Sequence, residues 1–323
     1  MTTAGAGLAP PPAVVHADMI SAIGNTPLVE MESLSPNPDV RILAKLESAN
    51  PTGSIKDRTA RSMIDDAERR GLIRPGDTIM EPTSGNTGIS LAMICRVRGY
   101  RLVAVMPSNV TEERKQLLTL YGAEIVESDG EFGSNGAVAM AKRLSREQGL
   151  FMPFQYGNPA NPRAHYEGTA AEIVRDCPEI DVFVAGLGTG GTLMGSVRRL
   201  KEHRQDIQVV ACEPVQGDDV SGLRSLEDGF VPPILDVSLL DRKLLVGNRE
   251  SIVMTRRLAR DEGVFAGLSS GGVMHVCARI AERMDRGTIV GIICDGGWKY
   301  LSAGVWTRDL DDVEETLDRG IFW

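Results

Sequence analysis

The chain has 323 residues, of which 35 are basic and 44 are acidic, so its formal net charge at pH 7 is −9. This balance argues against nucleic acid or an anionic membrane surface as the main partner. No apolar run is long enough to span a bilayer. The length suits roughly two domains, each with its own buried core.

The cysteines and the first residues indicate the compartment. The five cysteines are odd in number and show no C-x-x-C spacing, which is typical of buried thiols in a reducing compartment. Residues 1–17 are rich in Ala, Gly and Pro but lack the basic start and apolar stretch of a signal peptide, so they predict a flexible leader. We therefore expect a cytoplasmic protein.

From about Val40 onwards, apolar strand patterns alternate with amphipathic helix patterns. The predicted strands are 40–46, 78–81, 102–106, 124–126, 151–154, 182–185, 208–212 and 288–294. The predicted helices are 54–70, 87–98, 112–121, 135–148, 191–203, 250–262 and 271–286. This alternation predicts an α/β fold with largely parallel sheets covered on both faces. A second strand-helix series starts near Gly149, so we expect domains at 18–149 and 150–323 with a site in the cleft between them.

The run NPTGSIKDR at 50–58 predicts a helix start that presents a lysine. Ser54 is a good N-cap and Asp57 follows three residues later, so the helix is expected to begin at Ser54 with Lys56 in its first turn. The partial positive charge of a helix N-terminus disfavours a second cation, which suits an amine that must be neutral to react. A surface lysine on an amphipathic helix would have the same local pattern.

The run PTSGNTG at 82–88 joins a short apolar strand to an apolar helix. Its small hydroxyl and amide side chains have no packing purpose. A strand, a tight turn and a helix N-terminus together form an anion site of backbone N–H groups and hydroxyls.

A third run, GLGTGG at 186–191, also lies between a strand and a helix and fits the pattern G-x-G-x-x-G. Glu213 follows at the end of the next strand, as in a dinucleotide-binding domain, so an NAD(P)-dependent oxidoreductase is an alternative. Glycines let N–H groups approach a phosphate of either a dinucleotide or another cofactor. The dinucleotide interpretation leaves the runs at 50–58 and 82–88 unexplained.

Together these runs resemble the fold-type II pyridoxal-phosphate enzymes, and within them the cysteine synthase (O-acetylserine or O-phosphoserine sulfhydrylase) family. The resemblance extends from IGNTPL at 23–28 almost to the end of the chain. It implies a tryptophan synthase β-like fold with two three-layer αβα domains, in which part of 28–46 crosses to the second domain. It also implies a homodimer that binds pyridoxal 5'-phosphate, and an amino-acid substrate.

The resemblance also implies roles for particular residues. Lys56 would hold the cofactor and act as the catalytic base. Asn86 would contact the cofactor ring, and Ser269 its pyridine nitrogen, although Ser269 or Ser270 could instead cap the next helix. The residues implied to bind the cofactor phosphate are Gly188, Thr189, Gly190, Gly191 and Thr192. Those implied to bind the substrate carboxylate are Thr83, Ser84, Asn86, Thr87 and Gln155.

Two departures from the common O-acetylserine type resemble the actinobacterial branch that uses O-phosphoserine. The chain has DGGWKY at 295–300, where the common type has a Gly-Glu-Arg-Tyr-like run, and the stretch 213–232 is short and contains Arg224. A guanidinium pairs bidentately with phosphate, so we expect Arg224 to bind the substrate phosphate. Alternatively, Arg224 pairs with Glu227 or Asp228.

Further expectations concern mobility, partners and metals. The run at 106–114 resembles the start of a segment that closes over substrate. The aromatic tail 318–323 resembles a plug for the cleft, which a small sulfur-carrier protein could displace. A catalytically silent scaffold of the cysteine pathway would keep the fold without the activity. His165, His203 and His275 show no metal-ligand spacing, so no metal site is expected.

Overall fold

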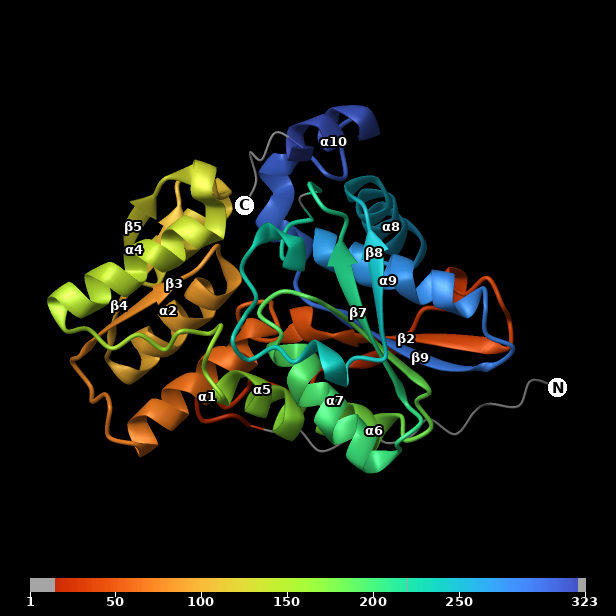
Figure 1. Ribbon diagram of the computed structural model, residues 1–323, viewed down its shortest axis with the longest axis horizontal. Helices are drawn as coiled ribbons and strands as arrows, with labels where there is room; N and C mark the ends of the chain where they lie inside the picture. The colour runs from red at the N-terminus through yellow and green to blue at the C-terminus, as the bar shows by residue number, and fades with distance from the viewer. Residues whose placement is uncertain (1–14, 219, 319–323) are drawn as a thin grey trace.

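The computed structural model describes residues 15–218 and 220–318. The predicted leader at 1–17 lies outside these residues except for 15–17, and the predicted plug at 318–323 lies outside them except for residue 318. The described chain forms two separate β-sheets, one with three strands and one with six (Figure 1). Within the described ranges, no helix is long and apolar enough to cross a membrane.

The six-stranded sheet has the order β1-β2-β9-β6-β7-β8. Its strands are β1 (Leu28–Glu30), β2 (Val40–Leu46), β6 (Val182–Gly186), β7 (Gln208–Pro214), β8 (Arg242–Val246) and β9 (Gly287–Ile293). Every neighbouring pair is parallel except β1 and β2. The early segment that carries β1 and β2 therefore pairs with the sheet formed by the second half of the chain.

Helices cover both faces of the six-stranded sheet. Alternate side chains of a strand point to opposite faces. On β6, Val182 and Val184 thus pack towards α8 (Asn248–Asp261) and α9 (Leu268–Ala281). Phe183 and Ala185 pack on the opposite face, towards α6 (Ala170–Asp176) and α7 (Gly191–His203). The run of apolar residues in β6 is explained by burial of both faces.

The three-stranded sheet follows the same principle. Its parallel strands are β3 (Thr78–Pro82), β4 (Arg101–Pro107) and β5 (Glu124–Ser128). Ile79 faces the core shared with α1 (Lys56–Arg69), α2 (Asn86–Arg98) and α3 (Glu112–Leu120), whereas Met80 faces α4 (Gly133–Gln148). The predicted α/β architecture with mostly parallel, helix-covered sheets is confirmed.

A buried ion cluster fixes helix α1 against the six-stranded sheet. Arg58 on α1 donates to Glu47, which follows β2, and to Glu172 on α6, with N···O distances of 2.7 and 2.6 Å. Lys45 on β2 adds a second contact to Glu172 at 2.8 Å. The first turn of α1, which carries Lys56, is thereby held close to the carboxyl end of β2.

Helix α1 begins later than predicted. The expected N-cap, Ser54, forms a β-bridge with Asp295, and the N–H of Ile55 donates to the carbonyl of Cys294. Residues 54 and 55 therefore pair with the chain just after β9. Because their backbone is engaged in this pairing, the helix starts at Lys56. Asp57 accepts from Thr52 and Ser90 and does not complete a capping box.

The predicted strand at 151–154 was wrong. Only Phe151 bridges to Ile79, because Pro153 lacks an N–H and Phe154 has a left-handed backbone with φ of 55°. The sequence interpretation also missed β1, β8, α10 (Leu310–Asp318) and three short helical segments between residues 160 and 176. The segment between residues 160 and 176 contains α5 (Ala160–Ala164), a π-helical turn (His165–Thr169) and α6.

Candidate active site

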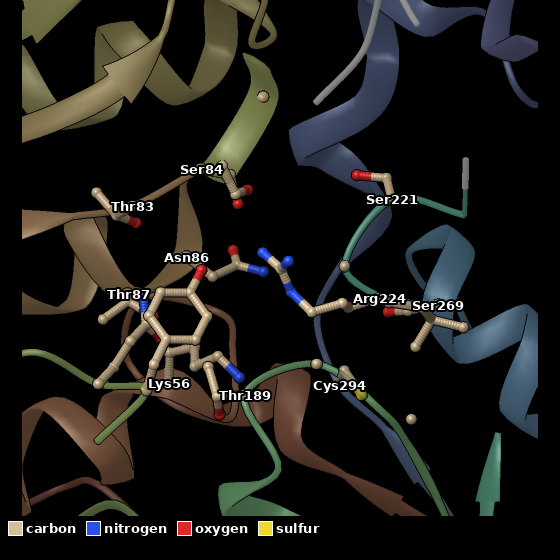
Figure 2. A pocket seen from close by; sticks show the side chains of 18 of the residues that line it. Lys56, Thr83, Ser84, Asn86, Thr87, Thr189, Ser221, Arg224, Ser269 and Cys294 are labelled. Carbon is tan, nitrogen blue, oxygen red and sulfur yellow. The ribbon is translucent and has the colours of Figure 1, made fainter. Parts of the chain in front are cut away.

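A cavity of about 300 Å³ lies where the carboxyl ends of both sheets face each other. Figure 2 shows it with Lys56, Thr83, Ser84, Asn86 and Thr87 on one side and Ser221, Ser269 and Cys294 on the other. All of the predicted site residues line it except Gly191: Lys56, Thr83, Ser84, Asn86, Thr87, Gln155, Gly188, Thr189, Gly190, Thr192, Arg224 and Ser269. Residues from six separate stretches of the sequence therefore meet in one pocket.

Lys56 is the first residue of α1 and its side chain points into the cavity (Figure 2). Burial lowers the pKa of its amine from the ordinary value, against the smaller opposing effects of Cys294 and Asp295. The described side chains offer Lys56 no hydrogen-bond acceptor, so its amine is free to bond to a group in the cavity. Such an amine can act as a nucleophile and as a base.

The loop between β3 and α2 supplies a group of hydroxyls and amides. Thr83 accepts from the N–H groups of Gly85 and Gly88, which fixes the turn. Thr87 donates to the side-chain oxygen of Gln155 at 2.6 Å, and Gln155 donates back to the carbonyl of Pro82 at 3.3 Å. The donors left over at this helix N-terminus suit a carboxylate.

The glycine-rich loop at 188–190 joins β6 to α7. Gly190 has φ of 86°, a left-handed conformation that favours glycine. Gly191 does not reach the cavity, because it packs on Asn161, whose side-chain oxygen would lie 1.9 Å from a Cβ at this position. Asn161 also donates to Thr189 at 3.1 Å. The loop thus opens towards the cavity at the N-terminus of a helix, where a phosphate is stabilised.

The dinucleotide alternative has no support at Glu213. Both oxygens of this buried carboxylate are occupied, one by the N–H of Leu226 at 2.8 Å and the other by Lys243 at 2.7 Å. Glu213 is 2% exposed and does not line the cavity, so it does not present an acceptor to a ligand there.

Ser269 and Ser270 begin α9 but have different surroundings. Gly267 is the N-cap of this helix, so neither serine caps it. Ser269 faces the cavity, whereas Ser270 accepts from the N–H of Cys294 at 2.9 Å. Cys294 corrects the expectation of buried thiols, because it is only half-buried and lines the pocket. Burial in the protein still raises the pKa of its thiol to about 12.

Arg224 lies across the pocket and contacts neutral groups. It donates to Asn135 at 3.1 Å and lies 5.6 and 5.1 Å from the ring centres of Tyr156 and Phe230. Among the side chains that the structure describes, it forms no ion pair. The alternative in which Glu227 neutralises Arg224 is therefore not what the structure shows.

Arg114 is a cavity residue that sequence reasoning did not assign. It is 4% exposed and donates to the carbonyl of Ser84 at 3.1 Å and to the hydroxyl of Ser221 at 3.0 Å. It thus links the loops that follow β3 and β7. Only its position in the run at 106–114, next to a predicted closing segment, could have pointed to it.

The histidines and acidic groups give no sign of a metal centre. His165 is buried within hydrogen-bonding distance of Thr59 and Thr169, and burial lowers the pKa of its imidazole well below the ordinary value. In residues 15–218 and 220–318, no three metal-binding side chains gather at one place.

The residues present fit pyridoxal phosphate. Lys56 offers a half-buried amine that donates to no described side chain, and the loop at 188–190 offers backbone N–H groups at a helix N-terminus. Both line one cavity with the neutral hydroxyl of Ser269. An amine, a phosphate site and a polar partner for the pyridine nitrogen are the features that hold this cofactor, and a hydroxyl can serve as that partner.

Comparisons with known proteins define the class. The family model described as pyridoxal-phosphate dependent enzyme matches residues 19–295, so the chain belongs to this family and is a fold-type II, pyridoxal-phosphate-dependent enzyme.

Within the family the chain is similar to cysteine synthases. Cysteine synthase B of Pseudomonas aeruginosa is 43% identical over 294 residues, which cover 91% of this chain and 98% of the relative. A solved structure of cysteine synthase from Entamoeba histolytica has a TM-score of 0.86 at 31% identity and covers 97% of this chain and 98% of its own. O-ureido-L-serine synthase has the same TM-score at 39% identity, with coverage of 93% and 96%. The chain is therefore a cysteine synthase-like enzyme.

Proposed function

We propose that the enzyme forms L-cysteine by replacing the β-substituent of an O-activated L-serine, with O-phosphoserine preferred over O-acetylserine. The observation that supports this preference is the charge of the cavity. Its lining contains the guanidinium groups of Arg114 and Arg224 but only one carboxylate, the exposed Glu131, in a chain of net charge −9. A dianionic leaving group suits such a cavity better than a neutral ester.

The proposal assigns the cofactor contacts as follows. Lys56 holds pyridoxal phosphate, and Asn86 and Ser269 face its ring. The loop residues that line the cavity bind its phosphate: Gly188, Thr189, Gly190 and Thr192. When bound, the cofactor supplies an electron sink for the pair released from the substrate Cα–H bond. A neutral serine beside the pyridine nitrogen leaves the ring unprotonated, which favours elimination over prolonged carbanion chemistry.

The chain's own residues then move the protons. Thr83, Ser84, Asn86, Thr87 and Gln155 hold the substrate carboxylate, so that the Cα–H bond faces Lys56. The neutral amine of Lys56 takes the Cα proton, and the leaving group departs from Cβ with the electron pair of its C–O bond. A sulfur nucleophile adds at Cβ, and Lys56 returns the proton to Cα. The nucleophile is sulfide, which gives L-cysteine directly, or the thiocarboxylate of a small sulfur-carrier protein. The thiocarboxylate gives an S-acyl adduct, and water must then cleave its acyl–sulfur bond to release L-cysteine.

Substitution of Arg224 tests whether the preferred leaving group is phosphate. Its guanidinium lies beside two aromatic rings and forms no ion pair with the side chains that the structure describes, so it can pair with a phosphate on Cβ. We expect Arg224→Ala to lower kcat/KM for O-phosphoserine about 10- to 100-fold, the range of a lost charge-assisted hydrogen bond. With O-acetylserine the same variant should stay within about threefold of wild type.

The measurement is steady-state kinetics with the two esters side by side, with sulfide as the common nucleophile. Arg286→Ala is the matched control, since Arg286 lies near the amino-terminal edge of the six-stranded sheet. An equal loss with both esters would show that Arg224 stabilises the pocket and does not select the substrate. Wild-type turnover of O-acetylserine alone would refute the preference.

The proposal also includes a homodimer in the cytoplasm and a domain division near residue 149. These parts rest on the resemblance, on the cysteine pattern and on the restart of the strand-helix series.

A further inference from the structure

The segment that follows β9 lies directly behind Asn86. Asp295 comes two residues after the end of the strand, and Lys299 lies in a 3-10 helix over Gly297–Ala303. Asp295 is 1% exposed and Lys299 is fully buried. Neither residue lines the cavity, and the proposed function gives neither a role.

Asp295 and Lys299 contact opposite ends of the Asn86 amide. The amide nitrogen donates to Asp295 Oδ2 at 2.7 Å, and the ammonium of Lys299 donates to the amide oxygen at 2.7 Å. A carboxylate can only accept and an ammonium can only donate. The two contacts therefore allow one orientation of the amide and exclude the flipped one.

Asp295 and Lys299 are themselves held in place by further contacts. The hydroxyl of Tyr300 donates to Asp295 Oδ2 at 2.7 Å, and the guanidinium of Arg114 lies 4.9 Å from the centre of the Tyr300 ring. Lys299 makes a second, longer contact to the carbonyl of Gly53 at 3.4 Å. These contacts link the Asn86 amide to the Gly53 turn just before α1, to α3 and to the end of β9.

The amide nitrogen has two hydrogens, and Asp295 takes only one of them. The second hydrogen remains for a group in the cavity, which Asn86 lines. The ammonium on the amide oxygen withdraws electron density from the nitrogen, so the remaining N–H becomes a stronger donor. The expected acceptor is an anionic oxygen of the cofactor ring.

We propose that Lys299 and Asp295 are positioning residues that aim and polarise the Asn86 amide towards the cofactor ring. This inference rests on the proposed contact between Asn86 and that ring. Lys299 acts through Asn86 and does not touch the substrate. Burial lowers the pKa of Lys299 to about 8, although the nearby Asp295 and Asp57 raise it and Arg114 lowers it further, so the ammonium form is present below this pH.

The test compares Lys299→Met, which removes the donor at similar length, with Lys299→Arg, which keeps a cationic donor. Two readouts besides turnover are used at pH 7: the affinity of the apo-protein for pyridoxal phosphate, and the visible absorption band of the bound cofactor. We expect Lys299→Met to weaken cofactor binding about 5- to 30-fold and to shift the band in the same direction as Asn86→Ala. Lys299→Arg should keep the wild-type band and remain within about threefold of the wild-type affinity.

A double-mutant cycle separates positioning from packing. If Lys299 acts through Asn86, then Lys299→Met should have no further effect on affinity or band position in the Asn86→Ala background. Thermal melts of each apo-protein serve as the folding control, and Lys299→Gln replaces Lys299→Met if the latter does not fold.

The outcomes distinguish this inference from the proposed function. A wild-type band and affinity in Lys299→Met, combined with altered values in Asn86→Ala, would overturn the positioning role and leave the proposed contact of Asn86 intact. Wild-type values in Asn86→Ala itself would refute that contact and the inference with it. Additive effects in the cycle would also overturn the positioning role.

Discussion

Glu81 shows how a single buried carboxylate shapes the substrate side of the pocket. It lies in β3, is fully buried, and accepts the N–H groups of Phe154 and Gln155 at 2.7 and 2.8 Å. Both bonds stabilise the left-handed turn at Phe154, after which the Gln155 side chain reaches Thr87. Burial raises the pKa of Glu81 to about 8, although the two N–H groups oppose this effect.

The raised pKa of Glu81 predicts a pH-dependent stability. In the unfolded chain the carboxyl ionises near its ordinary pKa of 4.5, but in the folded protein it keeps its proton up to about pH 8. Unfolding between these values therefore releases a proton, and the contribution of Glu81 to stability falls as the pH rises. Each unit of pKa difference corresponds to about 1.4 kcal/mol.

Glu81→Gln should therefore be less stable than wild type at pH 5, because its amide nitrogen cannot accept an N–H. The difference in free energy of unfolding between Glu81→Gln and wild type should become steadily smaller as the pH rises from 5 to 8. Urea unfolding at a series of pH values measures it, with Glu147→Gln on the surface of α4 as the control. A constant difference from pH 5 to 8 would contradict the prediction.

At the scale of elements, helix α7 depends on a close contact with the π-helical turn at His165–Thr169. A Cβ on Gly195 would lie 2.1 Å from the carbonyl of Pro162 and 2.8 Å from His165 Cβ. Only a glycine allows α7 to pack at this distance. The contact fixes the position of α7. It thereby also fixes the position at which the N-terminus of α7 and the preceding loop at 188–190 meet the cavity.

Gly195→Ala should destabilise the protein by about 1–3 kcal/mol, the range of an overpacked core, although alanine favours a helix. Weaker binding of pyridoxal phosphate should accompany this loss. Chemical unfolding and cofactor titration measure the two effects. Gly136→Ala in α4 is the control, since the added methyl would meet the exposed Phe132 side chain. Equal stability of both variants would disprove the close contact.

Most buried strands and long helices could be predicted from the sequence, because their apolar patterns are local. The strands at the edges of the sheet and the start of α1 could not be predicted in this way. The partly exposed strands β1 and β8 lack a clear pattern, and the start of α1 depends on pairing between Ser54 and Asp295. The strand predicted at 151–154 had the right composition but was interrupted by Pro153.

The residues of the candidate site also fall into those that the sequence could predict and those that it could not. Residues in glycine- and hydroxyl-rich runs between a strand and a helix could be found, because such loops have few other purposes. Arg114 and Cys294 could not be found, since each sits in an ordinary helix or strand pattern. Lys299 could not be found either, because the run DGGWKY at 295–300 gives no local sign of its contact with Asn86. Their importance arises from contacts with residues more than a hundred positions away, such as that between Lys299 and Asn86.

At the scale of the whole molecule, the cluster around Arg58 joins α1 to the six-stranded sheet. Arg58→Met should lower the free energy of unfolding by about 3–5 kcal/mol, because Glu47 and Glu172 would be left as buried carboxylates without their main partner. Urea unfolding at pH 7 measures this change. Arg41→Met is the matched control, since the Arg41–Glu30 pair is exposed and worth at most about 1 kcal/mol. A similar effect of both substitutions would show that the cluster adds nothing beyond a surface ion pair.

The pairing of β2 with β9 also has a consequence for synthesis on the ribosome. Strand β2 is made early, but the strand that covers its inner edge is the last of the sheet to be made. At about 5–20 residues per second, an interval on the order of tens of seconds separates the two. During this interval β2 presents an unpaired, apolar edge, which is a template for pairing with other chains. The β3–β5 unit can fold meanwhile, so the edge of β2 that waits for β9 is the part of the six-stranded sheet with the longest exposure to pairing with other chains.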